Sequence, residues 1–151
     1  MISVKKLRKV YKMSKKVQVT ALDGISFDVK EGEAVAVVGT SGSGKSTLLN
    51  ILGGLDRDYQ GEVLVEGKDI KEYNANYYRR HMLGTIFQQF YLVPTLSVAE
   101  NIMLPITLGG QFDKEYARKR LEHLLDRVGL SNRANHKPKE LSGGQAQLHA
   151  P

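Results

Sequence analysis

The feature that most constrains this chain is a short apolar run followed at once by a glycine-rich loop. Residues 34–38 are rich in valine, which is typical of a parallel strand buried on both faces. Residues 39–46, Gly-Thr-Ser-Gly-Ser-Gly-Lys-Ser, match the phosphate-loop pattern G-x-x-x-x-G-K-[ST] at every fixed position. A helix is expected over residues 45–52, where Gly53-Gly54 supplies a stop. This order predicts an α/β fold with a phosphate site.

The residue types of this loop explain the expected chemistry. Glycines let the backbone wind tightly enough for successive amide groups to point at phosphate oxygens. The N-terminus of the following helix adds partial positive charge. Lys45 is expected to reach the β- and γ-phosphates of a nucleotide, and the Ser46 hydroxyl to coordinate Mg²⁺. The simpler alternative is a flexible glycine turn before a helix, which the expected strand and helix around the loop disfavour.

Composition excludes several classes of protein. The chain has 151 residues, of which 41% are hydrophobic and 25% charged, as in soluble globular proteins. Residues 34–38 are the longest apolar run, so neither a transmembrane helix nor a secretory signal is expected. The absence of cysteine excludes disulfides and thiolate zinc sites. The net charge of +6 comes from residues 1–16, which suggests a solvated strand edge rather than a nucleic-acid-binding face.

Hydrophobic periodicity predicts the other elements of the chain. Short apolar or alternating runs predict strands at residues 17–22, 25–29, 62–66 and 83–87, with a turn at Asp23-Gly24 between the first two. Helices are predicted at residues 74–82 and 113–128, the second ending at Gly129. Ser97 and Glu100 form a capping-box pattern at the start of a further helix. Strands are thus expected first, and mainly helices from near Val93.

Leu141-Ser142-Gly143-Gly144-Gln145 is the second motif with chemical content. Ser142 is a good N-cap, and two glycines allow the backbone to approach an anion at a helix start. A capped turn between two helices explains the isolated pentapeptide equally well. The pentapeptide follows both a phosphate loop and a helical segment, which favours the anion-binding interpretation.

With these motifs the chain resembles the ATP-binding subunit of an ABC transporter. Residues 39–46 match the Walker A loop of that family, and residues 141–145 match its signature motif. Residues 87–92, Phe-Gln-Gln-Phe-Tyr-Leu, with Glu100-Asn101 further on, look like its Q-loop region. In detail the chain is similar to the subgroup that serves lipoprotein release, macrolide export and antimicrobial-peptide resistance.

The resemblance implies an ABC-type P-loop NTPase fold in the α/β class. Residues 1–92 would form an antiparallel β subdomain with the P-loop core, and residues 93–151 a helical subdomain that ends at the signature motif. After Gln145 the family continues with a basic, apolar helix and a strand that ends in Asp-Glu. Here Leu148 stands where the family usually has arginine, and Pro151 would break the helix.

This departure predicts that the chain is cut just after the signature motif. The C-terminal core strands, the Walker B aspartate and the catalytic glutamate would then be missing, and no residue of this chain is assigned as catalytic. We therefore expect the chain alone to hydrolyse ATP poorly or not at all. An incomplete sheet with exposed apolar surface is also expected.

The resemblance also implies a role for each residue of the site. Tyr11 would stack on adenine, although a strand tyrosine that packs locally is the alternative. Gln88, preferred over Gln89, would contact Mg²⁺ together with Ser46 and link the site to the transmembrane partner. Ser142, Gly143 and Gly144 would contact the γ-phosphate held by the other subunit of a head-to-tail dimer. The expected nucleotide contacts are Tyr11, Gly39, Thr40, Ser41, Gly42, Ser43, Gly44, Lys45, Ser46, Thr47, Gln88, Ser142, Gly143, Gly144 and Gln145.

The function expected from the resemblance is ATP binding and hydrolysis that drive a membrane export or mechanotransmission partner. The cofactors would be ATP and Mg²⁺, and the partners a second ATP-binding subunit and a transmembrane permease, with no nucleic acid. The protein would be cytoplasmic and peripheral on the inner face of the cell membrane. Two alternatives stay open: a catalytically inactive nucleotide-binding remnant, and another phosphate-loop enzyme such as a small-molecule kinase or a GTPase. Residues 141–145 and the lack of an Asn-Lys-x-Asp motif argue against the latter.

Overall fold

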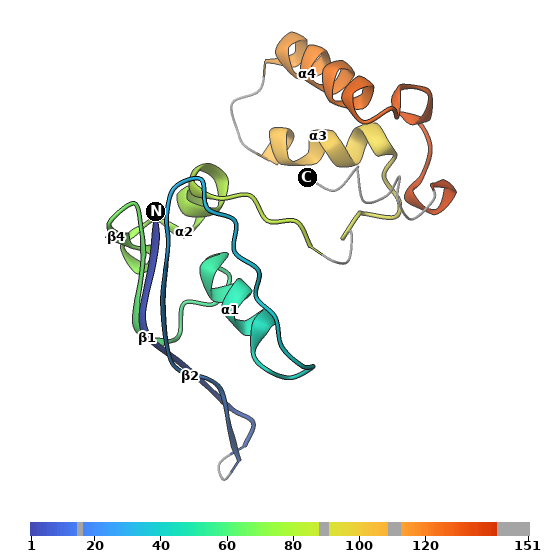
Figure 1. Cartoon of the computed structure of the whole chain (residues 1–151). Helices are drawn as coiled ribbons and strands as arrows, with labels where there is room; N and C mark the ends of the chain where they lie inside the picture. Colours follow the sequence, from blue (N-terminus) through green and yellow to red (C-terminus); the bar gives the residue numbers. More distant parts are fainter. Residues whose placement is uncertain (15–16, 88–90, 109–112, 142–151) are drawn as a thin grey trace. The chain divides into compact units, whose positions relative to one another are not determined.

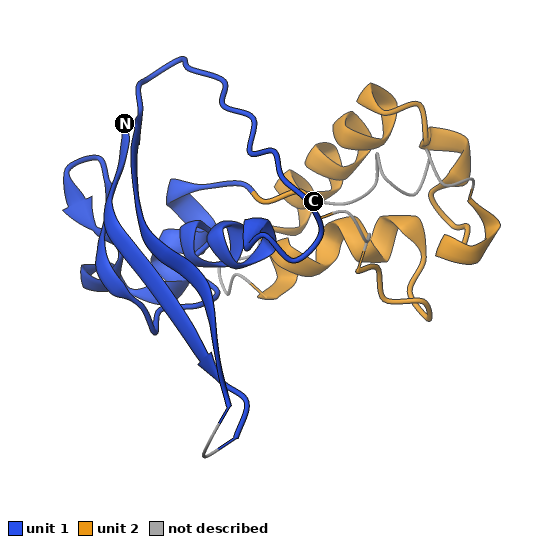
Figure 2. Ribbon diagram, turned by 60° about the horizontal axis from the view of Figure 1, so that its bottom comes forward, with its two compact units in different colours: residues 1–84 blue, residues 85–151 orange. Residues whose placement is uncertain are grey.

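The computed structural model describes residues 1–14, 17–87, 91–108 and 113–141. The chain divides into two compact units, Met1–Gly84 and Thr85–Pro151, which Figure 2 shows in different colours. We call them the sheet unit and the helical unit. Among the described helices, none is both long and apolar enough to cross a membrane.

The sheet unit is built on an antiparallel sheet with the strand order β2-β1-β3-β4 (Figure 1). Its strands are β1 (Ile2–Lys12), β2 (Gln18–Val29), β3 (Gln60–Val65) and β4 (Lys68–Asp69). β1 pairs with β2 on one edge and with β3 on the other. The expectation that the basic N-terminal segment is a strand edge is therefore wrong, because β1 is an inner strand whose basic side chains lie mostly on the solvated face.

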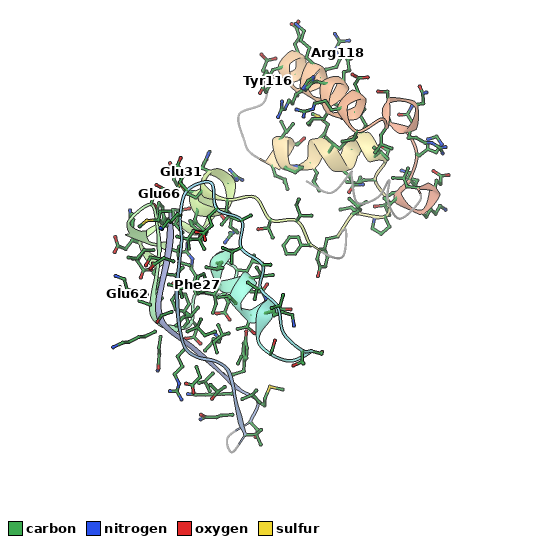
Figure 3. The ribbon with its side chains drawn as sticks, in the orientation of Figure 1. Phe27, Glu31, Glu62, Glu66, Tyr116 and Arg118 are labelled. Atoms are coloured by element: carbon green, nitrogen blue, oxygen red, sulfur yellow. The ribbon has the colours of Figure 1, made fainter. Side chains whose placement is uncertain are left out.

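The core of the sheet unit lies between one face of the sheet and the first helix, α1 (Lys45–Leu52). Its buried residues are Val4, Leu7, Leu22, Leu48, Ile51, Tyr59, Val63, Val65, Ile70 and Tyr78. Phe27 of β2 packs against this cluster on the side of the sheet that faces α1, whereas Glu62 of β3 is exposed (Figure 3). The predicted helix at residues 45–52 is confirmed, with Gly53 as its C-cap.

The predicted turn at Asp23-Gly24 is wrong, because β2 continues through these residues. Leu7 pairs with Ile25 and Lys9 with Leu22, so that β2 has one residue more than β1 in this interval. Gly24 has a φ of 70°, a left-handed conformation that glycine adopts without steric cost. The two residues therefore form a β-bulge, in which an extra residue is absorbed without reversing the chain.

The predicted strands at residues 34–38 and 83–87 are not formed in the described chain. Residues 30–44 run as an irregular segment from β2 to α1, and Val38 is 87% exposed. Ile86 is exposed as well. A parallel strand is stable only where neighbouring strands satisfy its N–H and C=O groups, and within the described residues no strand pairs with either segment. The expected exposed apolar surface is thus present at these two places.

Short helical segments complete the sheet unit after β4. They are a 3₁₀ turn at Ile70–Glu72, the helix α2 at Ala75–Tyr77 and a π-helical turn at Tyr78–Met82. The Asn74 side chain caps α2 by accepting hydrogen bonds from the backbone N–H groups of Asn76 and Tyr77, at 3.0 and 3.2 Å. The helical prediction for residues 74–82 is therefore confirmed.

The helical unit contains α3 (Val98–Leu108) and α4 (Lys114–Arg127), followed by 3₁₀ turns at Ser131–Arg133 and Pro138–Glu140. The two helices run side by side in Figures 1 and 2. Val98, Leu125 and Leu130 form its buried core. The outer face of α4 carries exposed residues such as Tyr116 and Arg118 (Figure 3). The prediction of a helix ending near Gly129 is confirmed, and Asp113 caps its start.

The predicted capping box at the start of α3 is also confirmed. The backbone N–H of Ser97 donates to Glu100 Oε2 over 2.6 Å, and the N–H of Glu100 donates to Ser97 Oγ over 3.2 Å. The first of these hydrogen bonds is the main reason why the pKa of Glu100 lies below its usual value.

Asn101 fastens the loop before α3 to the helix itself. Its side chain accepts a hydrogen bond from the N–H of Val93 at 2.9 Å. Its Nδ2, which has two hydrogens to donate, lies within hydrogen-bond distance of the carbonyl oxygens of Val93, Leu96 and Ser97, at 3.1, 3.2 and 3.0 Å. Because the Asn101 side chain is buried, water competes little for these hydrogen bonds.

We expect the substitution Asn101→Ala to lower the free energy of unfolding by about 1–3 kcal/mol, since the N–H of Val93 and the C=O of Leu96 lose this partner. The control Asn132→Ala, at an exposed position of the turn Ser131–Arg133, should change it by less than about 0.5 kcal/mol. Urea denaturation followed by circular dichroism at the helical band measures both. Equal effects of the two substitutions would contradict this role of Asn101.

Candidate phosphate-binding site

The glycine-rich loop enters α1 through backbone conformations that favour glycine. Gly42 and Gly44 have φ values of 80° and 89°, in the left-handed region. A Cβ atom on Gly44 would lie 2.4 Å from the carbonyl oxygen of Ala21 and 2.9 Å from a methyl group of Leu22. Position 44 therefore has no room for a side chain, and it sets the start of α1 directly against β2.

Lys45 lies across the loop that precedes it. Its Nζ donates hydrogen bonds to the carbonyl oxygens of Gly39 and Thr40, both at 2.8 Å, and to Ser43 Oγ at 3.4 Å. All three partners are neutral oxygens of the loop itself. Within the described residues these contacts hold the ammonium group in place without neutralising it, so its positive charge is available to an anion bound at the loop.

The N-terminus of α1 has donors to offer an anion. The first hydrogen bond of the helix runs from the N–H of Leu48 to the carbonyl of Gly44, over 2.9 Å. The N–H groups of residues 45–47 come before it, where an α-helix has no internal acceptor. Gly44 has no side chain to cap them, and the first turn of α1 contains no acidic residue. Ser46 is exposed and Thr47 half-buried in this same turn.

Of the predicted site residues, 39–44 form the loop and 45–47 the first turn of α1. Tyr11 lies on β1, where it pairs with Val19 of β2. The Tyr11 side chain is half-buried, and its hydroxyl donates to Asp56 Oδ2 over 3.3 Å. Gln88 lies outside the described residues, as do Gln89 and the signature residues Ser142, Gly143, Gly144 and Gln145.

The prediction from sequence missed Lys9 and Asp56, which contact each other beside Tyr11. Lys9 is only 5% exposed, and its Nζ lies 2.9 Å from the Asp56 carboxylate and 3.4 Å from Asp58 Oδ2. It also donates to the backbone oxygen of Asp58. The only available signal was the position of Lys9 between Leu7 and Tyr11 on the same face of a strand, and the surrounding basic residues obscure it.

This pair shifts the pKa values of both of its members. Burial by itself would lower the pKa of Lys9, but the hydrogen bond and charge of Asp56, with Asp58, outweigh burial and raise it. Burial alone would likewise raise the pKa of Asp56, but the hydrogen bond from Lys9, with those from Asp58 and Tyr11, lowers it instead. Both groups are therefore charged over a wide range of pH.

A tight glycine loop with a lysine across it, leading into an uncapped helix N-terminus, defines the chain as a phosphate-loop protein. A protein-family model described as "ABC transporter" matches residues 22–150. The chain belongs to the ABC transporter family.

Proteins of similar sequence belong to the same family. An uncharacterised ABC transporter ATP-binding protein of Thermotoga maritima is 45% identical over 92% of this chain and 60% of its own length. The lipoprotein-releasing system ATP-binding protein LolD of Saccharophagus degradans is 45% identical over 86% of this chain and 58% of its own length. The chain thus spans about three fifths of the length of these relatives.

Solved structures of the ABC transporter cassette MJ0796 share the fold of this chain. The dimeric structure of MJ0796 matches this chain with a TM-score of 0.85 and 39% sequence identity. The match covers 99% of this chain and 67% of the MJ0796 chain. A dimeric post-hydrolysis state bound to ADP and Pi has a TM-score of 0.85 and 40% identity over the same shares. The fold is therefore the N-terminal part of an ABC ATPase fold in the α/β class.

The close approach at Gly44 gives a first test of the site. Gly42→Ala introduces a side chain at a left-handed φ in open space, at an expected cost of about 1 kcal/mol. Gly44→Ala has the same strain and also meets Ala21 and Leu22, so its cost should be about 1–3 kcal/mol larger. Urea denaturation of the two variants measures the difference. A similar stability of both would show that β2 does not limit position 44.

The Lys9–Asp56 pair predicts how stability depends on pH. A carboxyl group with a lowered pKa stabilises the fold above its usual value of 3.8, and this contribution is lost as the pH falls through the lowered value. The raised pKa of Lys9 stabilises the fold below 10.5, and this is lost as the pH rises through the raised value.

We therefore expect the thermal midpoint to fall at both extremes of pH, and Asp56→Asn to flatten the acidic limb. The control Asp28→Asn removes an exposed carboxylate of β2 and should leave that limb as it is. Thermal unfolding measured across the pH range gives both limbs. An acidic limb that is unchanged in Asp56→Asn would contradict the assignment.

Proposed function

We propose that this chain is the nucleotide-binding part of an ABC transporter ATP-binding subunit. Residues 39–47 would bind the phosphates of ATP. The observation that supports this most is the position of Lys45, whose Nζ lies 2.8 Å from two loop carbonyl oxygens beside the uncapped N-terminus of α1. We assign the β subdomain and P-loop core to residues 1–92, and the helical subdomain to residues 93–151.

The chemistry of the loop suits a triphosphate. Phosphate oxygens accept hydrogen bonds from backbone N–H groups at a helix N-terminus, and the Lys45 ammonium adds a charge-assisted contact. Mg²⁺ prefers oxygen ligands and retains several waters beside phosphate oxygens. The exposed hydroxyl of Ser46, in the first turn of α1, fits this preference, and Gln88 would supply a second oxygen. Mg²⁺ would neutralise charge on the phosphates.

The proposed partners rest on the relatives. MJ0796 forms a dimer in its solved structures, one of which holds ADP and Pi. We infer that the whole protein forms a head-to-tail homodimer, in which Ser142, Gly143 and Gly144 of one subunit contact the γ-phosphate bound by the other. The names of the LolD relatives favour a transmembrane permease partner in lipoprotein release or related export. The protein would then be peripheral on the inner face of the cell membrane.

ATP hydrolysis is the activity that we propose for the whole protein. Nucleotide binding without turnover is the second candidate for these 151 residues. It needs only the phosphate-binding groups that the structure describes, which are the Lys45 ammonium and the uncapped N-terminus of α1. Release of phosphate from Mg-ATP distinguishes the two candidates: turnover by these residues that is lost in Lys45→Ala supports hydrolysis, and its absence supports binding alone.

Binding of Mg-ATP tests the proposed site directly. We expect Lys45→Ala to weaken it at least about tenfold, because a charge-assisted contact to phosphate is lost. Lys114→Ala is a matched control, since Lys114 is the first residue of α4 as Lys45 is of α1. The control removes the same charge from the same helix position and should leave the affinity unchanged. Isothermal titration calorimetry measures both, and an equal affinity of the two variants would overturn the proposal.

A further inference from the structure

Lys9 differs from the other basic residues of β1, because its side chain is buried. An ammonium group leaves water only at considerable cost, so it persists in a core only where carboxylates and hydrogen bonds replace the water. Asp56 and Asp58 supply both kinds of contact to Lys9. The Lys9 Nζ also lies 5.0 Å from the centre of the Tyr11 ring, within the range of a cation–π contact.

Asp56 is held in position from several sides. Its backbone N–H donates to the carbonyl oxygen of Asn50 in α1 over 3.1 Å. Its carboxylate accepts hydrogen bonds from Lys9 Nζ at 2.9 Å and from the backbone N–H of Asp58 at 3.0 Å. The carboxylate is mostly buried, so that water competes little for these bonds. Asp56 is therefore a fixed acceptor attached to the end of α1.

The Tyr11 hydroxyl is bonded to this fixed acceptor. The distance from Tyr11 Oη to Asp56 Oδ2 is 3.3 Å, and the cation of Lys9 faces the same ring. These two contacts restrict the rotation of the Tyr11 ring, which the backbone pairing of Tyr11 with Val19 alone would leave free. The ring is only half-buried, so part of its surface is open to a ligand.

We propose that Asp56, held by Lys9, is a positioning residue that orients the Tyr11 ring for stacking on a nucleotide base. The inference rests on the proposed function, in which α1 binds the phosphates. The ring and the phosphate loop lie along the same strand, since Ala21 of β2, which meets Gly44 of the loop, is two residues from the strand partner of Tyr11. A ring that is already oriented loses less conformational freedom when a base stacks on it, and binds more tightly for that reason.

The alternative is that the cluster only stabilises the sheet unit. Two ligands separate these roles: Mg-ATP, which has a base, and Mg-tripolyphosphate, which has none. A positioning role affects the first ligand alone, whereas a purely structural role affects both ligands together.

The test uses Tyr11→Phe, which keeps the ring but removes the hydroxyl that bonds Asp56. We expect the affinity for Mg-ATP to fall about three- to tenfold, and the affinity for Mg-tripolyphosphate to stay as in the wild type. Asp56→Asn should act in the same direction. Tyr116→Phe, at an exposed tyrosine of α4, is the matched control and should change neither affinity.

Each result decides the question even if Asp56→Asn does not fold, because Tyr11→Phe leaves the Lys9–Asp56 pair intact. Unchanged Mg-ATP affinity in Tyr11→Phe overturns the positioning role, and so does an equal loss for both ligands. A wild type that binds Mg-ATP no more tightly than Mg-tripolyphosphate, with both dependent on Lys45, overturns this inference but leaves the proposed function in place. Failure of the wild type to bind either ligand overturns the proposed function itself.

Discussion

Pairing of β1 on both of its edges is the constraint on which the sheet unit depends. Because β2 and β3 flank it, β1 places Val4 and Leu7 in the middle of the core that α1 covers. The same pairing fixes the path of β2, whose Ala21 carbonyl oxygen leaves no room for a side chain at Gly44. The start of α1, and with it the orientation of the phosphate loop, therefore follows from the antiparallel sheet.

Two lysines of this unit show how partners decide the role of a charge. Lys9 is buried against Asp56 and Asp58, so its charge is already balanced within the protein. Among the residues that the structure describes, Lys45 is bonded to carbonyl and hydroxyl oxygens, which orient the ammonium group but carry no charge to compensate it. The first arrangement stabilises and positions its neighbours, whereas the second leaves a cation available to a phosphate.

Predictions from local sequence succeeded where the decisive contacts are local. The helix at 45–52, the capping box of Ser97 and Glu100 and the helix ending near Gly129 all depend on residues a few positions apart. The predicted turn at Asp23-Gly24 and the predicted strand at residues 34–38 were wrong. A bulge and a turn use the same residues, and only pairing with β1 distinguishes them. A parallel strand depends on distant neighbours, which the described residues do not supply to 34–38.

The amino-acid sequence by itself determined the phosphate loop and the helix after it, because a motif of fixed spacing specifies them. It also determined the membership of the ABC transporter family, through the match of the family model to residues 22–150. Only the tertiary structure showed that β1 is an inner strand and that Asp56 lies between Lys9 and Tyr11. Asp56 is far from both residues along the chain, and its carboxylate meets them only because α1 and β1 pack into one core. Contacts of this kind follow from the packing of whole elements, which no local pattern encodes.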